Sequence, residues 1–505
     1  MTLSTAHVLG GGLAGMAAAW ELAKAGWKVV IYEESGRLGG KAGSDAKPTD
    51  TGEYIMDHGY HLFPEWYRNV RTLMGEAGIS YRRITDPGDL FIGAARPVPT
   101  TSLEGNILEA ENAGGVTLAQ FAASVIVLAA TPDEELMPLN VKCFLIGRFG
   151  ETVAGQLAPS YEGLIFKALS GSVEELSALS LAKMFRRWIE EPGNLKKPAW
   201  SALIGNLQTT FIEPIQQALA SLGCEINTGS GVSGLTFADG GIASFKVGKD
   251  LIEVAEGDVV VSALPADRLA AVLAASDGDP LPTALVEKVE TIASHMEPMS
   301  AVDVVFNVKL RTPDQHFAFD GSEHSLTAYD ISKVWPPDEL PPGSGGSTVL
   351  QLIVARSGGL FDGLDPDAYD EALIAAVLGD LDTVMPGVDR VGVYPMSNVD
   401  AKLSIDWVGI HEFRPDPRPL GDGSNFWICG DWMDSSIGIA SMEAAVGSGR
   451  SVGHAIANPG ATVTLDPPTT ADGWWSRYAP LARLVVRSIG RRGSRRPRLN
   501  DQSGS

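Results

Sequence analysis

The chain contains little cysteine and little histidine, with three and eight residues respectively among 505. Cys143, Cys224 and Cys429 stand at unrelated spacings, which argues against a disulfide framework and favours a reducing compartment. The histidines and cysteines form no cluster with metal-ligand spacing, and no Ser-His-Asp order can be defined. The sequence therefore predicts neither a metal site nor a catalytic triad of this kind.

The chain also lacks a recognisable targeting or membrane-spanning segment. Its first residues, MTLSTAHV, place no lysine or arginine before the first apolar run, unlike a signal peptide. No uninterrupted apolar run is long enough to span a bilayer. Since 44% of the residues are hydrophobic and the length allows about three domains, we expect a large cytoplasmic protein with a well-formed core.

Positive charge is scarce in the chain and unevenly placed. The net charge of -23 argues against nucleic acid as a partner of the main body. Eight arginines and no acidic residue lie between Trp474 and Arg498, so the rest of the chain carries -31. Helical spacing from Pro480 places Leu481, Leu484, Val485 and Ile489 on one side, and Arg483, Arg487 and Arg491 on the other.

This basic amphipathic segment, preceded by Trp474, Trp475 and Tyr478, fits a peripheral anchor on an anionic membrane surface. A solvated basic tail folded against the acidic body is the alternative.

The N-terminus, HVLGGGLAGMAAAWELAKAGWKVVIYEE, predicts a strand, a glycine turn, a helix and a second strand. Gly10 permits the tight turn, Gly12 lets the backbone approach a pyrophosphate, and Gly15 allows close packing of helix and strand. Glu33 lies where a carboxylate can accept hydrogen bonds from ribose hydroxyls. The first helical N–H groups would face the phosphates. We therefore predict a dinucleotide site.

Two further segments narrow the choice of nucleotide. SGRLGGKAG follows the second strand, and NFWICGDWMDSSIGIASMEAAVGSGR lies near the far end of the chain. Together they resemble FAD enzymes of the amine oxidase and carotenoid desaturase superfamily. The resemblance implies that Asp431 lies near the ribityl and pyrophosphate, that the helix opening around Met442 faces the flavin ring, and that Val232 lies beside the adenine. No cysteine has a setting typical of covalent flavin attachment, so we expect non-covalent FAD.

The predicted cofactor contacts combine the fingerprint with the residues that carry the resemblance. They are Gly10, Gly12, Leu13, Ala14, Gly15, Glu33, Glu34, Arg37, Gly39, Gly40, Lys41, Gly59, Val232, Gly430, Asp431, Ser441 and Met442.

Within the superfamily, the chain is most similar to the plant and cyanobacterial type phytoene and zeta-carotene desaturases. The similarity lies in DHGYHLFPEWYRNVRTLMGEAGI, which contains Gly59 and His61, in NLQTTFIEPIQQALASLGCEI, and in IASMEAAVGSGR. Ala444 stands where the family usually has glycine, and the loop between Asp431 and Ser441 differs from the usual form. These departures bear on the substrate rather than on the cofactor.

The expected fold class is α/β, with a Rossmann-like FAD-binding domain built from discontinuous segments. These segments are residues 1–84, 201–280 and 416–458. An α+β substrate domain is interleaved with them, with a helical part at 85–200 and a second part at 281–415. Residues 459–505 are predicted to form a linker and the basic amphipathic tail.

The resemblance implies an FAD-dependent oxidoreductase that desaturates a long apolar isoprenoid by hydride transfer to the flavin at a membrane surface. Quinone or oxygen would then accept the electrons. His61 is the candidate catalytic residue, although its ring could instead hydrogen-bond a backbone carbonyl. A flavin amine oxidase is one alternative. Such enzymes commonly place an aromatic residue where this chain has Ala440 and Ser441. A non-catalytic, membrane-recruited flavoprotein is another.

Overall fold

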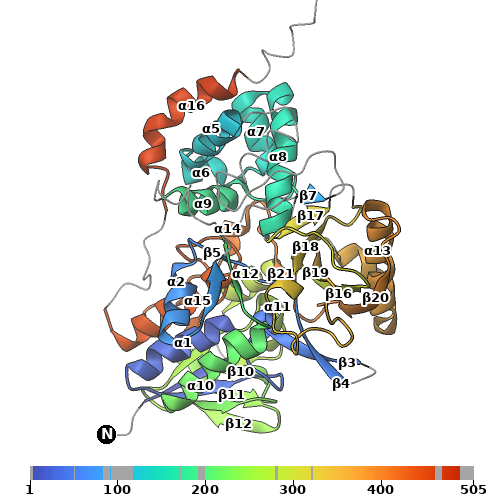
Figure 1. The fold of residues 1–505 in the computed structure, drawn as a ribbon. Coiled ribbons are helices and arrows are strands. Elements are labelled where there is room, and N and C mark those ends of the chain that lie inside the picture. The colour runs from blue at the N-terminus through green and yellow to red at the C-terminus, as the bar shows by residue number, and fades with distance from the viewer. Residues whose placement is uncertain are drawn as a thin grey trace, which may run out of the picture.

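The computed structural model describes residues 4–49, 52–83, 91–92, 118–169, 172–190, 200–278, 282–314, 316–319, 322–355, 357–460 and 469–488. Figure 1 shows three parts: a parallel sheet with its helices at the bottom, a mainly antiparallel sheet at the right, and a group of helices at the top. Within the described ranges, no helix is long and apolar enough to cross a membrane.

The parallel sheet joins segments from both ends of the chain. In spatial order it consists of β22 (Phe426–Ile428), β13 (Val259–Ser262), β1 (Thr5–Leu9), β2 (Lys28–Tyr32) and β9 (Glu225–Asn227). Every neighbouring pair is parallel, and Val8 of β1 lies between Ile31 and Val261. Because both faces of such a sheet are covered, its strands are rich in Val and Ile.

Two helices from opposite ends of the sequence pack together over one face of this sheet, α1 (Leu13–Lys24) and α15 (Met442–Ala457). Glycine allows their close approach. A Cβ atom on Gly449 would lie 2.1 Å from the carbonyl oxygen of Ala14, and one on Gly453 would lie 2.7 Å from that of Ala18. Any larger residue would therefore push the two helices apart.

The other face is covered by a four-stranded sheet and two helices. The sheet has the order β12 (Asp250–Glu253), β11 (Gly241–Val247), β10 (Val232–Ala238) and β14 (Asp277–Gly278), and the helices are α11 (Ala266–Ala274) and α12 (Thr283–Ala293). Leu9 and Tyr32 of the parallel sheet share a core cluster with Leu235 and Phe245.

The second large sheet is antiparallel except at one edge, where β17 and β7 run parallel. Its order is β20 (Arg390–Met396), β16 (Ser300–Phe306), β19 (Val349–Val354), β18 (Leu326–Asp330), β17 (Phe317–Phe319) and β7 (Phe91–Ile92). Helix α13 (Tyr369–Val384) covers one face through Leu373, Val377 and Leu381.

Smaller elements connect these sheets. They are the hairpin of β3 (Ser44–Thr49) and β4 (Gly52–Asp57), the three-stranded sheet of β5 (Phe63–Pro64), β8 (Trp200–Leu203) and β6 (Tyr81–Arg83), and the helix α2 (Arg68–Glu76). Glu443 in the first turn of α15 accepts hydrogen bonds from the backbone of Asn69 and Val70, which joins α15 to the start of α2.

The helices at the top form what we call the helical subdomain. It comprises α5 (Leu118–Ala129), α6 (Asp133–Leu136), α7 (Val141–Phe149), α8 (Glu151–Leu169), α9 (Ala178–Ile189) and, from the far end of the chain, α16 (Ala479–Val486). Helix α16 packs on α5 through the buried residues Ala479, Ala482 and Val486. The predicted basic segment is thus partly an ordered helix. Ile489 and the arginines after it lie outside the described residues.

The mixture of helix and sheet around a parallel nucleotide-type sheet confirms the predicted α/β, Rossmann-like class.

Candidate functional site

One cavity of about 970 Å³ begins at the carboxyl ends of β1 and β2 and extends between the two large sheets and the helical subdomain. Its lining includes every predicted cofactor contact except Gly15, and it includes His61. A crevice outside the carboxyl ends of parallel strands is where open α/β sheets bind their ligands. Residues from four distant stretches of sequence therefore meet in one place.

The glycine turn at the start of α1 forms one end of the cavity. Gly10 has a φ of 102°, which favours glycine. A Cβ atom on Gly12 would meet nothing nearer than the Gly40 Cα at 4.0 Å, whereas one on Gly15 would lie 2.0 Å from the Gly10 carbonyl oxygen. Gly12 thus faces open space and Gly15 is buried in packing. No side chain caps α1 at Gly12, so its first N–H groups are available to an anion.

Two glutamates end β2 beside this turn. The Glu33 carboxylate accepts hydrogen bonds from the backbone N–H groups of Gly11, at 2.7 Å, and Ser35, at 2.9 Å. Glu34 lies against Gly231, next to Val232. These residues line the cavity together, which is the arrangement expected around an adenosine.

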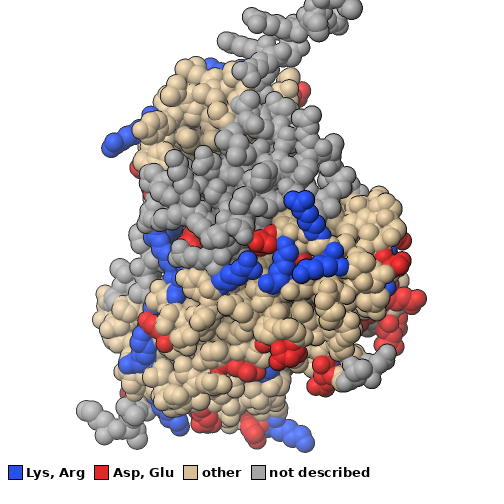
Figure 2. Space-filling view, viewed as in Figure 1, with Lys and Arg blue, Asp and Glu red and all other residues tan. Residues whose placement is uncertain are grey.

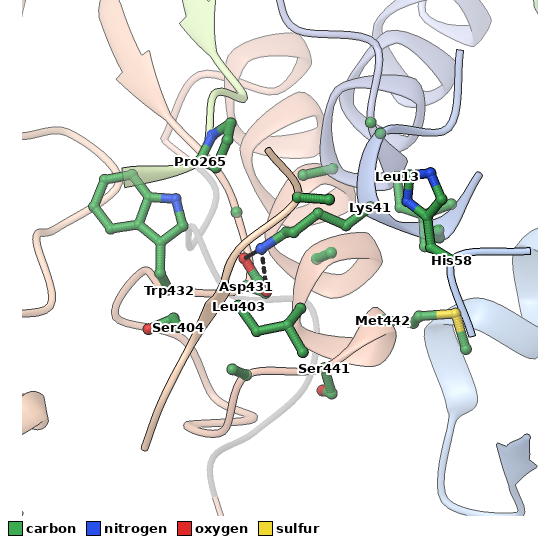
Figure 3. A pocket seen from close by; sticks show the side chains of 18 of the residues that line it. Leu13, Lys41, His58, Pro265, Leu403, Ser404, Asp431, Trp432, Ser441 and Met442 are labelled. Atoms are coloured by element: carbon green, nitrogen blue, oxygen red, sulfur yellow. Dashed lines mark hydrogen bonds and ion pairs between the residues drawn. The ribbon is translucent and has the colours of Figure 1, made fainter. Parts of the chain in front are cut away.

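Lys41 and Asp431 meet near the middle of the cavity, as Figure 3 shows. The Lys41 Nζ lies 3.0 and 3.2 Å from the two carboxylate oxygens of Asp431. Pro265 and Trp432 lie to one side of this pair in Figure 3, and Leu13, His58 and Met442 lie to the other.

Arg37 lines the cavity but directs its guanidinium to another group. Its Nε donates to Asp45 Oδ1 at 2.6 Å, and His58 Nε2 lies 2.8 Å from the other oxygen of Asp45. The hydrogen bond from His58, followed by the charge of Arg37, lowers the pKa of Asp45. The three groups form a network at the cavity wall, and this ties the Arg37 side chain to Asp45 of β3 and to His58, which follows β4.

His61 hydrogen-bonds a backbone carbonyl, the structural role considered for it above. Its Nδ1 lies 2.7 Å from the carbonyl oxygen of Gly59. Burial lowers the pKa of His61 to about 4, so the ring is neutral at neutral pH. Because only an N–H can donate to a carbonyl, the proton is assigned to Nδ1, which leaves a lone pair on Nε2.

The far end of the cavity is aromatic. The Trp188 and Trp200 rings lie edge to face with centroids 5.2 Å apart, and Trp66 and Tyr67 do so at 4.7 Å. We call the following set the aromatic wall: Tyr60, Trp66, Tyr67, Phe185, Trp188 and Trp200. The carboxylates in the described lining lie elsewhere: Glu33 and Glu34 at the end of β2, Asp400 beside Arg268, Asp406 beside Arg414, and Asp431 beside Lys41.

A buried ion pair between Arg414 and Asp406 lies at the cavity, whose lining includes Asp406. Arg414 NH2 donates to Asp406 at 2.6 Å, and both side chains are almost fully buried. Arg414 NH1 also donates to the carbonyls of Asp431 and Met433, and Asp406 accepts from the backbone N–H of Ala440. The pair therefore fixes both ends of the loop that leads from Asp431 to Ser441.

Comparison with known proteins identifies the family. Residues 13–457 match the family described as flavin containing amine oxidoreductase. The chain belongs to this family. It is accordingly an FAD-dependent oxidoreductase.

Among curated relatives, this oxidoreductase is 24% identical over 480 residues to the 15-cis-phytoene desaturase of Solanum lycopersicum, with 89% of this chain and 77% of that protein covered. It is 26% identical over 479 residues to the hydroxysqualene dehydroxylase of Rhodopseudomonas palustris, covering 88% and 96%. The fold also resembles putrescine oxidase bound to putrescine, with a TM-score of 0.63, 16% identity and coverage of 90% and 98%.

The cavity of the oxidoreductase suits FAD on structural grounds. A long cavity joins an uncapped helix N-terminus, which can take a pyrophosphate, to a carboxylate at Asp431 and a second helix start at Ser441 and Met442. Gly12 leaves room for the pyrophosphate of the cofactor to approach the protein backbone.

The sequence did not reveal every lining residue of this oxidoreductase. Trp66 and Tyr67 belong to the desaturase-like segment, so the motif contained a signal for them. Trp188 and Trp200 come from separate elements and carry no such signal. Arg414 is buried although no local pattern in the sequence indicates this, while Arg418 is partly buried.

Proposed function

We propose that this oxidoreductase desaturates a long apolar isoprenoid, or a similarly apolar lipid, taken from a membrane surface. The observation that carries the proposal is the aromatic wall. It gives the cavity a large apolar surface, and the carboxylates of the described lining lie outside it. Each CH₂ group buried against such a surface contributes about 0.8 kcal/mol, so a long hydrocarbon would bind there strongly.

Bound FAD would supply the hydride acceptor, and quinone or oxygen would reoxidise it. The chain's own contribution is to orient the substrate and exclude water. The cation left after hydride loss is acidic enough that a weak base can remove the adjacent proton. His61 Nε2 is such a base, because the pKa of about 4 keeps its lone pair available at neutral pH. The loop fixed by Arg414 and Asp406 holds Asp431 and Ser441 in place.

An amine oxidase is the second candidate, and specific observations favour it. The family description and the fold of putrescine oxidase point toward amines. Although Ala440 and Ser441 are small, Tyr67 reaches Ser441 by a side-chain hydrogen bond, so an aromatic ring does lie beside the flavin segment. Aromatic rings can also bind a cation. Against this reading, a desolvated ammonium group needs a counter-charge, and the aromatic wall provides none.

Anaerobic reduction of the bound flavin by a panel of compounds tests the proposal. We expect phytoene or another polyisoprenoid in detergent micelles to bleach the flavin and to give a product two hydrogens lighter. Putrescine and other simple amines should leave the flavin oxidised. Bleaching by amines with all long-chain lipids inert would establish the amine oxidase instead, and bleaching by nothing in the panel would favour the non-catalytic flavoprotein.

A Trp188→Ala variant sharpens this test, because Trp188 contributes to the aromatic wall and comes from α9 rather than from a predicted cofactor-binding segment. It should raise the KM for the lipid while leaving the FAD content unchanged. Trp27→Ala, near the start of β2 and absent from the described lining, is the matched control.

A further inference from the structure

Helix α16 and the turn before it present large apolar side chains to solvent. Tyr478, Leu481 and Leu484 are 54%, 61% and 62% exposed, and among the described large hydrophobic residues only Val391 is as exposed as the two leucines. The three residues are spaced by three, so they share one side of the helix. We call them the outer face of α16. Exposed apolar side chains gathered on one face mark an interaction site more often than single ones do.

The outer face cannot turn inward, because the opposite side of the helix is fixed. Ala479, Ala482 and Val486 are buried against α5. The Gln120 Nε2 of α5 donates to Ser488 Oγ at 3.0 Å. Trp474, in the turn before α16, donates from its indole nitrogen to the carbonyl of Ile189 at 2.7 Å.

Exposed arginines lie beside the outer face on the same segment. Arg477, Arg483 and Arg487 are exposed, and the sequence from Trp474 to Arg498 contains no acidic residue. Figure 2 shows blue side chains at the edge of a largely tan surface in this upper left corner of the molecule, whereas red and blue side chains are mixed over the lower part. Leucines bordered by arginines are typical of a helix that lies in the headgroup region of an anionic bilayer.

We infer that the outer face of α16 docks on an anionic membrane with the helix lying parallel to its surface. A second copy of the chain fits less well, because two leucines and a tyrosine offer far less than the roughly 800 Å² per partner that stable protein interfaces bury. A bilayer needs no such area, since arginines attract its lipids and short apolar side chains enter between headgroups.

The docking site is connected to the cavity wall. Ile189, which accepts the bond from Trp474, follows Trp188 of the aromatic wall on α9. The outer face lies at the end of the molecule away from the nucleotide sheet. Docking would therefore bring the aromatic end, not the nucleotide end, toward the lipid. That the membrane supplies the substrate rests on the proposed function, whereas the docking itself does not.

The test is sedimentation of the full-length holoprotein with vesicles of phosphatidylcholine alone or mixed with phosphatidylglycerol. We expect binding to the mixed vesicles only. Leu481→Ser/Leu484→Ser should weaken it about tenfold or more through lost apolar burial. Arg483→Gln/Arg487→Gln should weaken it by a similar factor through lost attraction to the anionic lipid. The controls are Leu251→Ser and Lys249→Gln/Arg311→Gln, which alter exposed residues of the same types elsewhere and should bind like the wild type.

Undiminished sedimentation of Leu481→Ser/Leu484→Ser would overturn the inference, and so would equal binding to neutral vesicles. A dimer that dissociates on the same substitution would assign the face to a second copy instead. The flavin spectrum of each variant shows whether it is folded. Because sedimentation needs no turnover and the micelle assay needs no bilayer, failure of docking and failure of the proposed reaction are distinguishable.

Discussion

Gly12 and Gly15, two glycines of the same fingerprint, differ in the atoms that an added side chain would contact. We expect Gly12→Val to fold, because its Cβ faces open space, but to lose FAD, because that space is where the pyrophosphate would approach. Flavin absorbance of the purified variant measures the loss. Acid precipitation of the wild type should release FAD into the supernatant, since the attachment is predicted to be non-covalent; flavin in the pellet would contradict this.

Gly15→Ala is the contrasting variant. Its methyl group would lie 2.0 Å from a backbone oxygen, so helix α1 must shift. Overpacking of this kind costs about 1–3 kcal/mol, and we expect a lower Tm together with weaker FAD binding. An unchanged Tm for Gly15→Ala would show that α1 is less tightly held than the structure indicates.

Arg414 offers a second test at the residue scale. Arg414→Met would leave Asp406 buried without its counter-charge and would release the carbonyl of Asp431. Breaking a buried pair from one side costs about 3–5 kcal/mol, and the FAD Kd should rise because the loop to Ser441 loses its support. Arg418→Met removes a pair with Asp422, whose side chain is 89% exposed, so it should cost at most about 1 kcal/mol. Equal denaturation midpoints for the two variants would refute the distinction.

The pH dependence follows from His61. Because burial lowers its pKa to about 4, the base is present at neutral pH and is lost only as the pH falls toward that value. Stopped-flow flavin reduction by the lipid should therefore show no His61-dependent inflection near the ordinary value of about 6.5. His61→Gln should slow reduction at neutral pH, where the wild-type ring is a free base, while FAD stays bound. An inflection near 6.5 that disappears in His61→Gln would mean that the ring titrates normally.

At the scale of elements, we expect the contact between α1 and α15 to shape the cofactor site, since both helices begin at the cavity. Gly449→Ala would force them apart by placing a methyl group 2.1 Å from the Ala14 carbonyl. We expect a lower Tm and weaker FAD binding. In the control Gly147→Ala on α7, the new methyl group meets nothing within 4 Å, so the helix should gain about 0.5–1 kcal/mol. Equal effects would show that the helices can separate freely.

Elements whose signals are local were predictable from the sequence. The glycine turn, α1 and β2 follow from spacing within one short segment, and the amphipathic pattern placed Leu481 and Leu484 on one side of a helix. The packing of α16 on α5 was not predictable, because it depends on Ala479 and Ala482, which are small enough to suit either environment. The burial of Arg414 depends on Asp406 and on a distant loop, and no local pattern reports such a partner.

At the scale of the whole molecule, the aromatic wall was likewise not predictable from local sequence patterns. Trp66, the α9 residues Phe185 and Trp188, and Trp200 of β8 come from three separate stretches of the chain, and only the assembled fold brings them together. The cofactor is identified by short motifs, whereas the substrate end depends on how the parts are arranged.

The order of strands in the parallel sheet also has a consequence for biosynthesis. The edge strand β22 and the helix α15 are translated after more than 400 other residues, yet they complete the site that β1 and α1 begin. If these segments hold the flavin as proposed, a nascent chain would bind it only after residues near 457 have left the ribosome. Translation that stops early would thus yield proteins that carry the glycine turn but no prosthetic group, and cellular supply of FAD matters only after synthesis is nearly finished.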